Sequence, residues 1–152
     1  MKIFLGIILV CFSTLLGYIL SAKFTFRKEF YNDFYNFNNK LKQEISFRQT
    51  TLIALVKTFS NTDFNLTLKS YIENSTFSFN KNYLKKDEIE YFSNYLKTIG
   101  AGDKSSQLDF LDKSNVDILE KQKQTSDEEK KYKILYIKLS FLLGLILFVL
   151  VL

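Results

Sequence analysis

The amino-acid sequence predicts an all-α protein in which two transmembrane helices flank a cytoplasmic antiparallel helical bundle. An uncharged apolar segment lies near each end of the chain, at 3–22 and 139–152, and nearly all of the charge lies between them. The chain contains no proline, and of its five glycines only Gly100 and Gly102 lie outside the apolar segments. Sequences so poor in helix breakers favour helices.

The first apolar segment predicts an N-terminal transmembrane helix over residues 1–22. A helix of this length rises about 30 Å, which is the thickness of the hydrocarbon core of a bilayer. A cleaved signal peptide fits the segment less well. Its basic n-region is reduced to Lys2, its apolar core is too long, and a cut after Ala22 would leave the bulky Leu20 at the −3 position.

The second apolar segment predicts a C-terminal transmembrane helix over residues 134–152. The run 139–152 is too short to cross a bilayer alone. It reaches the required length when 134–137 join it and Lys138 extends its ammonium group back to the headgroups.

Basic residues predict the sidedness of the chain in the cell membrane. By the positive-inside rule, the domain 23–133 is cytoplasmic and both termini are extracytoplasmic, with only Lys2 outside. The same bases predict contact with anionic membrane lipid. No base-rich stripe interleaved with aromatic residues indicates nucleic acid, so we expect no such partner. The inner flanks carry Lys23, Arg27, Lys28, Lys130, Lys131, Lys133 and Lys138.

Helical spacing predicts the core of the cytoplasmic domain. Apolar residues from Phe30 to Ile45 recur every three or four positions, which places them on one helical face. An aromatic ligand-binding surface is the alternative interpretation of that face. Thr50 or Thr51 is expected to cap a short helix through Phe59. The face consists of Phe30, Phe34, Phe37, Leu41 and Ile45, and the short helix carries Leu52, Leu55, Val56 and Phe59.

The region 60–86 is interrupted by polar residues but keeps helical spacing from Phe64 to Ile72, with strand potential at 76–79. Asp87 with Glu90 resembles a capping box at the start of the next helix. The core face of that helix is Ile89, Phe92, Leu96 and Ile99.

Two glycines and an aspartate predict a tight corner between two antiparallel helices. Gly100 is expected to end one helix in the left-handed conformation, Gly102 follows, and Asp103 can cap the next helix. Asp103 and Gln107 therefore have two interpretations: a helix cap and a first-turn polar residue, or contacts to a partner protein. The helix that begins near Lys104 carries a heptad-like stripe and can continue into the second apolar segment. The stripe is Leu108, Leu111, Asn115, Ile118, Gln122 and Thr125.

Small residues recur at intervals of four in both apolar segments. Such spacing lets transmembrane helices approach closely, so we expect the two segments to pack on each other. Aligning Lys23 with Lys138 as markers of membrane depth would place Gly17 opposite Gly144. The residues concerned are Ser13, Gly17 and Ser21 in the first segment and Ser140 and Gly144 in the second.

The composition excludes most catalytic chemistry. The chain has no histidine, one cysteine and no phosphate-binding glycine loop, so it lacks the ligands of His/Cys metal sites and the parts of serine–histidine or P-loop catalysis. Cys11 is interpreted as a packing residue. The acidic runs at 87–88 and 127–129 are explained by helix-start electrostatics and solvation. We therefore expect a non-enzyme without cofactor or metal.

The order of these motifs resembles the stage III sporulation protein AB family. The most specific part is Ile99-Gly100 followed by Asp103 and Gln107, which is similar to the family signature L-G-x-x-D-x-x-x-Q, with Ile in place of the commoner Leu and Thr51 where a proline is often found. The other matching positions are Gly6, Ser13, Thr14, Gly17, Tyr18, Ala22, Glu44, Ile45, Phe47, Leu52, Lys133, Tyr136 and Gly144.

The resemblance implies a mother-cell membrane protein of the channel complex between mother cell and forespore. It implies a cytoplasmic domain similar to those of the platform proteins of type II secretion and type IV pilus machines. The implied partners are the cytoplasmic stage III sporulation AA ATPase and other membrane proteins of the complex, and self-association stays open. A membrane-anchored sensory or adaptor module that binds a ligand or peptide is the alternative from a different class.

Overall fold

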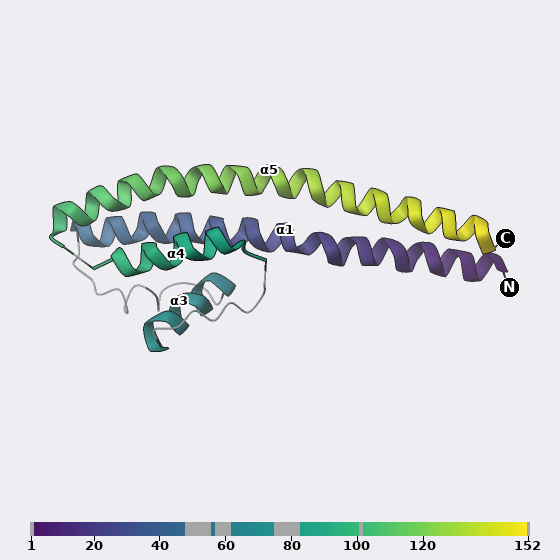
Figure 1. Ribbon diagram of the computed structural model, residues 1–152, viewed down its shortest axis with the longest axis horizontal. Helices are drawn as coiled ribbons and strands as arrows, with labels where there is room; N and C mark the ends of the chain where they lie inside the picture. The colour runs from purple at the N-terminus through teal and green to yellow at the C-terminus, as the bar shows by residue number, and fades with distance from the viewer. Residues whose placement is uncertain (1, 48–55, 57–61, 75–82, 101, 152) are drawn as a thin grey trace. The chain divides into compact units, whose positions relative to one another are not determined.

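The computed structural model describes residues 2–47, 56, 62–74, 83–100 and 102–151, and within these residues it contains four α-helices and no strand. Figure 1 shows their order along the chain. The two outer helices are by far the longest. Because the described residues form helices and no strand, the all-helical class predicted above is confirmed. The helices are α1 (Lys2–Phe47), α3 (Asp63–Asn74), α4 (Lys86–Thr98) and α5 (Lys104–Val151).

The chain divides into two compact units, to which α1 and α5 both contribute. The paired-helix unit comprises Met1–Lys28 and Lys123–Leu152, and the bundle unit comprises Glu29–Gln122. Each unit has its own packing.

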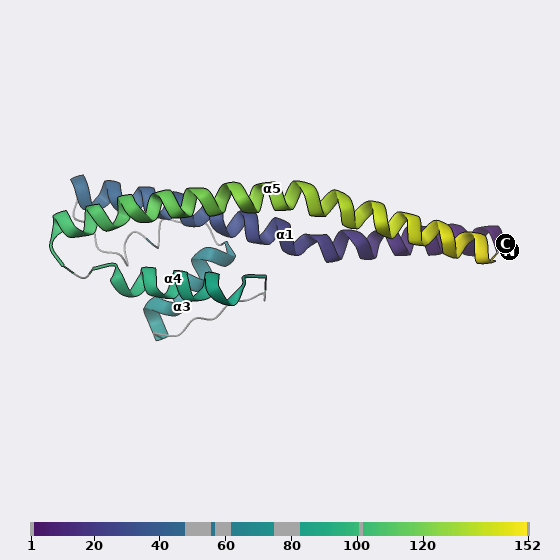
Figure 2. The same cartoon turned by 45° about the horizontal axis from the view of Figure 1, so that its top comes forward.

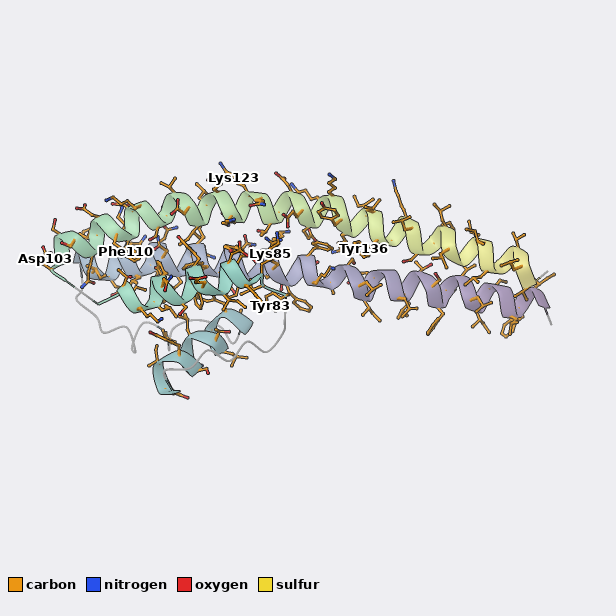
Figure 3. All side chains as sticks on the ribbon, in the orientation of Figure 1. Tyr83, Lys85, Asp103, Phe110, Lys123 and Tyr136 are labelled. Atoms are coloured by element: carbon orange, nitrogen blue, oxygen red, sulfur yellow. The ribbon has the colours of Figure 1, made fainter. Side chains whose placement is uncertain are left out.

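In the paired-helix unit, the first part of α1 and the last part of α5 run antiparallel and side by side, with the two chain ends at the same end of the pair (Figures 1 and 2). Both helices are long and apolar enough to cross a membrane. Their large apolar side chains point outward (Figure 3), and many are more than half exposed. Such surface is costly in water but is suited to lipid. Examples are Phe4, Phe12, Ile19, Ile134, Leu143 and Ile146.

In the bundle unit, all four helices contribute to one aromatic core. Phe34 is completely buried and meets Phe92 and Tyr95 edge-on, with ring centroids 5.1 and 4.7 Å apart. Edge-to-face pairs of this kind add to the stabilisation that burial of the rings supplies. The buried apolar residues are Phe30, Tyr31, Phe34, Phe37, Leu41, Val56, Phe64, Leu68, Leu84, Phe92, Tyr95, Leu96, Leu111 and Ile118.

The helical faces predicted from spacing are confirmed. The predicted face of α1 is buried at four positions and packs against the core at the fifth, Ile45; the buried positions are Phe30, Phe34, Phe37 and Leu41. Phe64 and Leu68 lie buried on α3. The proposed cap at Thr50 or Thr51 and the strand potential at 76–79 lie outside the described residues, and of the short helix only Val56 is described, as helical and buried.

The start of α4 corrects one prediction. The capping interaction was expected between Asp87 and Glu90, but Lys85 is the residue that precedes the helix, and its amide donates a hydrogen bond of 2.9 Å to the Glu88 carboxylate. The pair has the spacing of a capping box, displaced by two residues. Burial explains the choice, because Glu88 is 3 % exposed and lies against the bundle.

Candidate functional site

Small residues bring α1 and α5 into backbone contact in the paired-helix unit. A Cβ atom added to Gly17 would lie 2.2 Å from the Ser140 hydroxyl oxygen, and one added to Gly144 would lie 2.9 Å from the Cα of Val10. Ser13 donates a hydrogen bond of 2.6 Å to the Ser140 carbonyl. Ser21 is fully buried, and its hydroxyl donates to Tyr18 of its own helix. The small residues therefore form the contact face of the pair.

The register of this pair differs from the expected one. Gly17 lies opposite Ser140 rather than Gly144, a displacement of four residues or about one helical turn. Lys138 was used to mark the membrane boundary, but the apolar segment of α5 begins four residues earlier, at Ile134. Phe24 of α1 contacts Tyr132 of α5. Because the helices are antiparallel, Ala22 and Ile134, each two residues closer to its chain end, lie at the same level along the pair. The observed register thus aligns the boundaries of the two apolar segments.

An aromatic cluster lies at this boundary. The Phe24 ring stacks on Tyr132 at 5.0 Å between centroids and meets Tyr136 at 5.7 Å. The Lys23 ammonium lies over the Phe24 and Tyr136 rings, at 5.1 and 5.4 Å from their centroids. Aromatic residues are enriched where a membrane protein passes from lipid to water, and the position of the cluster agrees with that preference.

A charged cluster lies on the polar side of the aromatic residues. The Arg27 guanidinium pairs with Glu128, and the Glu129 carboxylate pairs with Lys28 at 3.5 Å and Lys133 at 3.2 Å. Burial by itself would raise the pKa of Glu129, but the hydrogen bond and charge of Lys133, with the charge of Lys28, lower it. Glu128 and Glu129 were interpreted as solvated helix-start acids. That interpretation is wrong for Glu129, which is only 8 % exposed.

The corner between α4 and α5 lies in the bundle unit, where Figure 3 labels Asp103 beside it. Gly100 and Gly102 have φ angles of +85° and +93°, in the region that favours glycine. Asp103 accepts a hydrogen bond from the Ser106 hydroxyl, which together with backbone amides lowers its pKa. The Gln107 side chain donates to the Gly102 carbonyl at 3.2 Å. Both polar residues thus have local roles, and neither role tests contact with a partner.

A polar network crosses the aromatic core of the bundle. The amide nitrogen of Asn38 donates to the Leu111 carbonyl at 3.1 Å and to Asn115 at 3.3 Å, and its amide oxygen accepts from the Tyr95 hydroxyl at 2.8 Å. Asn115, a polar member of the predicted stripe on α5, thereby contacts α1. Asn38 was not predicted to lie in the core, although its position four residues after Phe34 and three before Leu41 places it on the buried face of α1.

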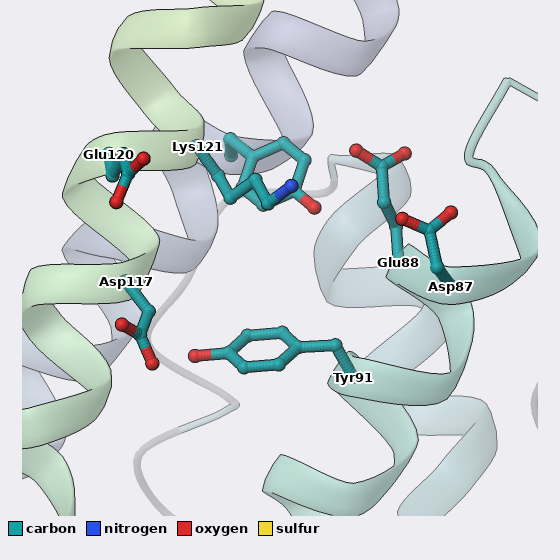
Figure 4. Close-up of a pocket in the computed structure, with 7 residues that line it drawn as sticks. Asp87, Glu88, Tyr91, Asp117, Glu120 and Lys121 are labelled. Carbon is teal, nitrogen blue, oxygen red and sulfur yellow. The ribbon is translucent and has the colours of Figure 1, made fainter.

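A groove between α4 and α5 contains a pocket of about 320 Å³ (Figure 4). Figure 4 shows the Tyr91 ring extending from α4 toward Asp117 on α5. Burial and the charge of Asp117 raise the pKa of Tyr91 to about 12. The tyrosine is therefore neutral at physiological pH. The lining residues are Tyr31, Asp87, Glu88, Tyr91, Asp117, Glu120 and Lys121.

The chemistry of these features is that of packing, ion pairing and surface contact. Among the described residues, no group of three or more His, Cys, Asp or Glu side chains is placed to hold a metal ion. The groove is lined by acids and tyrosines together with Lys121.

Comparison with known proteins supplies one match. The family model described as stage III sporulation protein AB matches residues 63–152, which is more than half of the chain. The match covers α3, α4, the corner with its glycines and the whole of α5. No curated protein and no solved structure matches the chain.

Proposed function

The chain belongs to the stage III sporulation protein AB family, and from that membership we propose that it is a non-enzymatic membrane platform of the channel between mother cell and forespore. In this role the bundle unit docks the cytoplasmic stage III sporulation AA ATPase beneath the mother-cell membrane. The family places the chain in spore formation. The docking role and the likeness to secretion platform proteins rest on the sequence resemblance.

One observation carries the proposal: α1 and α5 are each a single helix with both an apolar segment of membrane length and a segment of the bundle unit. α1 runs without interruption from Lys2 to Phe47, and α5 from Lys104 to Val151. A helix transmits displacement along its axis because each turn is hydrogen-bonded to the next. Motion received from an ATPase by the bundle would therefore reach the membrane segments through two continuous helices.

The aromatic face of α1 gives no support to the sensory alternative. That alternative requires the face to be available to a ligand, whereas Phe34 and Phe37 are fully buried and Phe30 is 3 % exposed. The face is the closed core of the bundle. A surface that docks a partner must therefore lie elsewhere on the bundle unit.

Docking can be tested with the full chain in lipid nanodiscs and the purified ATPase. Retention of the ATPase on these nanodiscs, and not on empty ones, is the expected result. Failure to bind at micromolar concentrations would overturn the docking role. Asp103→Asn separates the two interpretations of the corner, because asparagine caps helices as well as aspartate but carries no charge. Normal binding by this variant would make Asp103 a structural residue.

Transmission can be tested by interrupting α5 at residue 130. A short Gly-Ser insertion there is expected to abolish sporulation while leaving the protein in the membrane, since glycine weakens helix interiors. An alanine- and lysine-rich insertion of seven residues, two turns of helix, is the matched control and is expected to retain more activity. Equal loss of sporulation in both variants would mean that the insertions act by changing the helical register of α5. Normal sporulation with the Gly-Ser insertion would overturn the transmission role.

A further inference from the structure

The basic residues at the boundary of the apolar segments fall into two groups. Arg27, Lys28 and Lys133 belong to the cluster formed with Glu128 and Glu129. Two carboxylates thus offset most of the charge of three bases. These three side chains have little net charge to offer to a further ligand.

The second group consists of four exposed lysines, which we call the lysine girdle: Lys23, Lys130, Lys131 and Lys138. In the described part of the chain, none of their ammonium groups pairs with a carboxylate. This includes Lys131, whose i−4 neighbour Asp127 is an acid that could have paired with it. The girdle therefore keeps its full charge of four.

The girdle lies where the apolar surface ends. Lys23 follows Ala22 directly, and its ammonium lies over the rings of Phe24 and Tyr136. The Lys131 ammonium lies 5.6 Å from the centroid of Tyr132. Contacts of this kind hold the lysine ammonium group at the same depth as the aromatic ring. Aromatic rings are enriched at the level of the lipid headgroups, so the ammonium groups lie where they can contact these headgroups.

Lys138 is the member of the girdle that lies furthest into an apolar segment. It lies four residues beyond Ile134, about 6 Å along the helix, and so it begins within the apolar segment. Its side chain is exposed, and a lysine at this depth places its ammonium group at the headgroups by extending along the helix. A phosphodiester is the group that such an ammonium meets there.

From this division we propose that the lysine girdle binds the phosphodiester headgroups of anionic phospholipids and enriches them around the protein, whereas the cluster of Arg27, Lys28 and Lys133 does not. Each juxtamembrane base contributes about 1 kcal/mol at an anionic surface, which corresponds to about fivefold in lipid preference. The acids Glu128 and Glu129 thus determine which of the seven bases contact lipid. The proposal does not depend on the ATPase.

The test reconstitutes the full chain in phosphatidylcholine vesicles and measures the relative association of spin-labelled phosphatidylglycerol and phosphatidylcholine. Lys23→Gln with Lys131→Gln is expected to reduce the preference for phosphatidylglycerol at least fivefold. Glu129→Gln with Lys133→Gln removes one acid and one base of the cluster, so the net charge of the cluster is unchanged, and this variant is expected to change the preference less than twofold. Equal losses in the two double variants, or no loss in either, would overturn the proposal.

A third variant keeps the proposal testable if the second is unstable. Glu128→Gln with Glu129→Gln releases three bases and is expected to increase the preference for phosphatidylglycerol, and an unchanged or lower preference would contradict the proposed division. Soluble glycerol phosphate at millimolar concentration is expected to leave the lipid preference unchanged. Displacement of the lipid by this compound would show a closed phosphate site in place of a lipid girdle.

Discussion

Asn38 is the residue on which the bundle core depends most specifically, because its one amide serves three partners. Removing the amide leaves the buried Tyr95 hydroxyl without its acceptor and takes from the Leu111 carbonyl the bond that it accepts in addition to that of its own helix. An unsatisfied buried polar group costs about 1–3 kcal/mol. We therefore expect Asn38→Ala to destabilise the bundle by at least about 2 kcal/mol, measured as a lower thermal midpoint by circular dichroism in a fixed detergent.

The control for this prediction is Asn36→Ala, two residues earlier on the same helix and exposed. Exposed substitutions usually change stability by less than about 0.5 kcal/mol, so its midpoint should remain near that of the natural chain. Equal losses in the two variants would contradict the role of the buried network, because alanine has the higher helix propensity and propensity alone would raise both midpoints.

Glu129 predicts a pH dependence with a definite sign. Its pKa is lower in the folded chain than in the unfolded chain. The stability that it contributes is therefore fully present above the ordinary glutamate pKa of about 4.3 and is lost as the pH falls through the lowered folded value. We expect the difference in thermal midpoint between the natural chain and Glu129→Gln to be largest at pH 7 and to shrink as the pH falls below the ordinary glutamate pKa of about 4.3. A difference that stays constant over this range would contradict the assignment.

At the scale of elements, helical faces could be predicted from the sequence but contacts between helices could not. The three- and four-residue spacing from Phe30 to Ile45 is a property of one helix, and it was sufficient to find the core face. The register of α1 against α5 depends on both helices together. One misplaced boundary marker, Lys138, moved the prediction by a turn, whereas Gly17, Ser140 and Gly144 lie at the contact in the observed register.

The cluster of Arg27, Glu128 and Glu129 escaped prediction for the same reason. Its members are about a hundred residues apart in the sequence, and no local pattern marks an acid as paired with a distant base. The acidic run at 127–129 is typical of a solvated helix face when it is viewed alone. The corner at Asp103 was easier to predict, because the conformation of a glycine and the capping of a helix depend on residues that are neighbours in the sequence.

Close packing of α1 on α5 predicts a rescue between two positions. Gly17→Ala would place a methyl group 2.5 Å from the Ser140 Cβ and 3.0 Å from the Tyr136 carbonyl oxygen, so we expect it to lower the thermal midpoint in detergent. Ser140→Gly removes the nearer obstacle and should restore part of the loss in the double variant. Leu16→Ala, at an exposed neighbouring position, is the control. Additive effects of Gly17→Ala and Ser140→Gly would contradict the contact.

At the scale of the whole molecule, the structure indicates that both chain ends lie on one side of a membrane, and the charge pattern predicts which side that is. The two chain ends lie at the same end of the paired-helix unit (Figure 1), where a Cβ atom on Gly6 would meet the Phe148 ring at 2.3 Å. Both ends therefore lie on one side of any membrane that the pair spans. The bases on the inner flanks predict that this side is extracytoplasmic.

Fusions to the full chain test this prediction. Alkaline phosphatase, which folds to an active enzyme only outside the cytoplasm, is expected to be active when fused to the C-terminus, and green fluorescent protein inserted at Gly102 is expected to fluoresce. The positive-inside rule assigns the orientation to Lys and Arg near the membrane ends. Replacing Lys23, Lys130, Lys131 and Lys138 with glutamine should therefore reduce the phosphatase activity of the C-terminal fusion. Full phosphatase activity in that variant would show that other features determine the orientation, and an inactive fusion in the natural chain would place the termini in the cytoplasm.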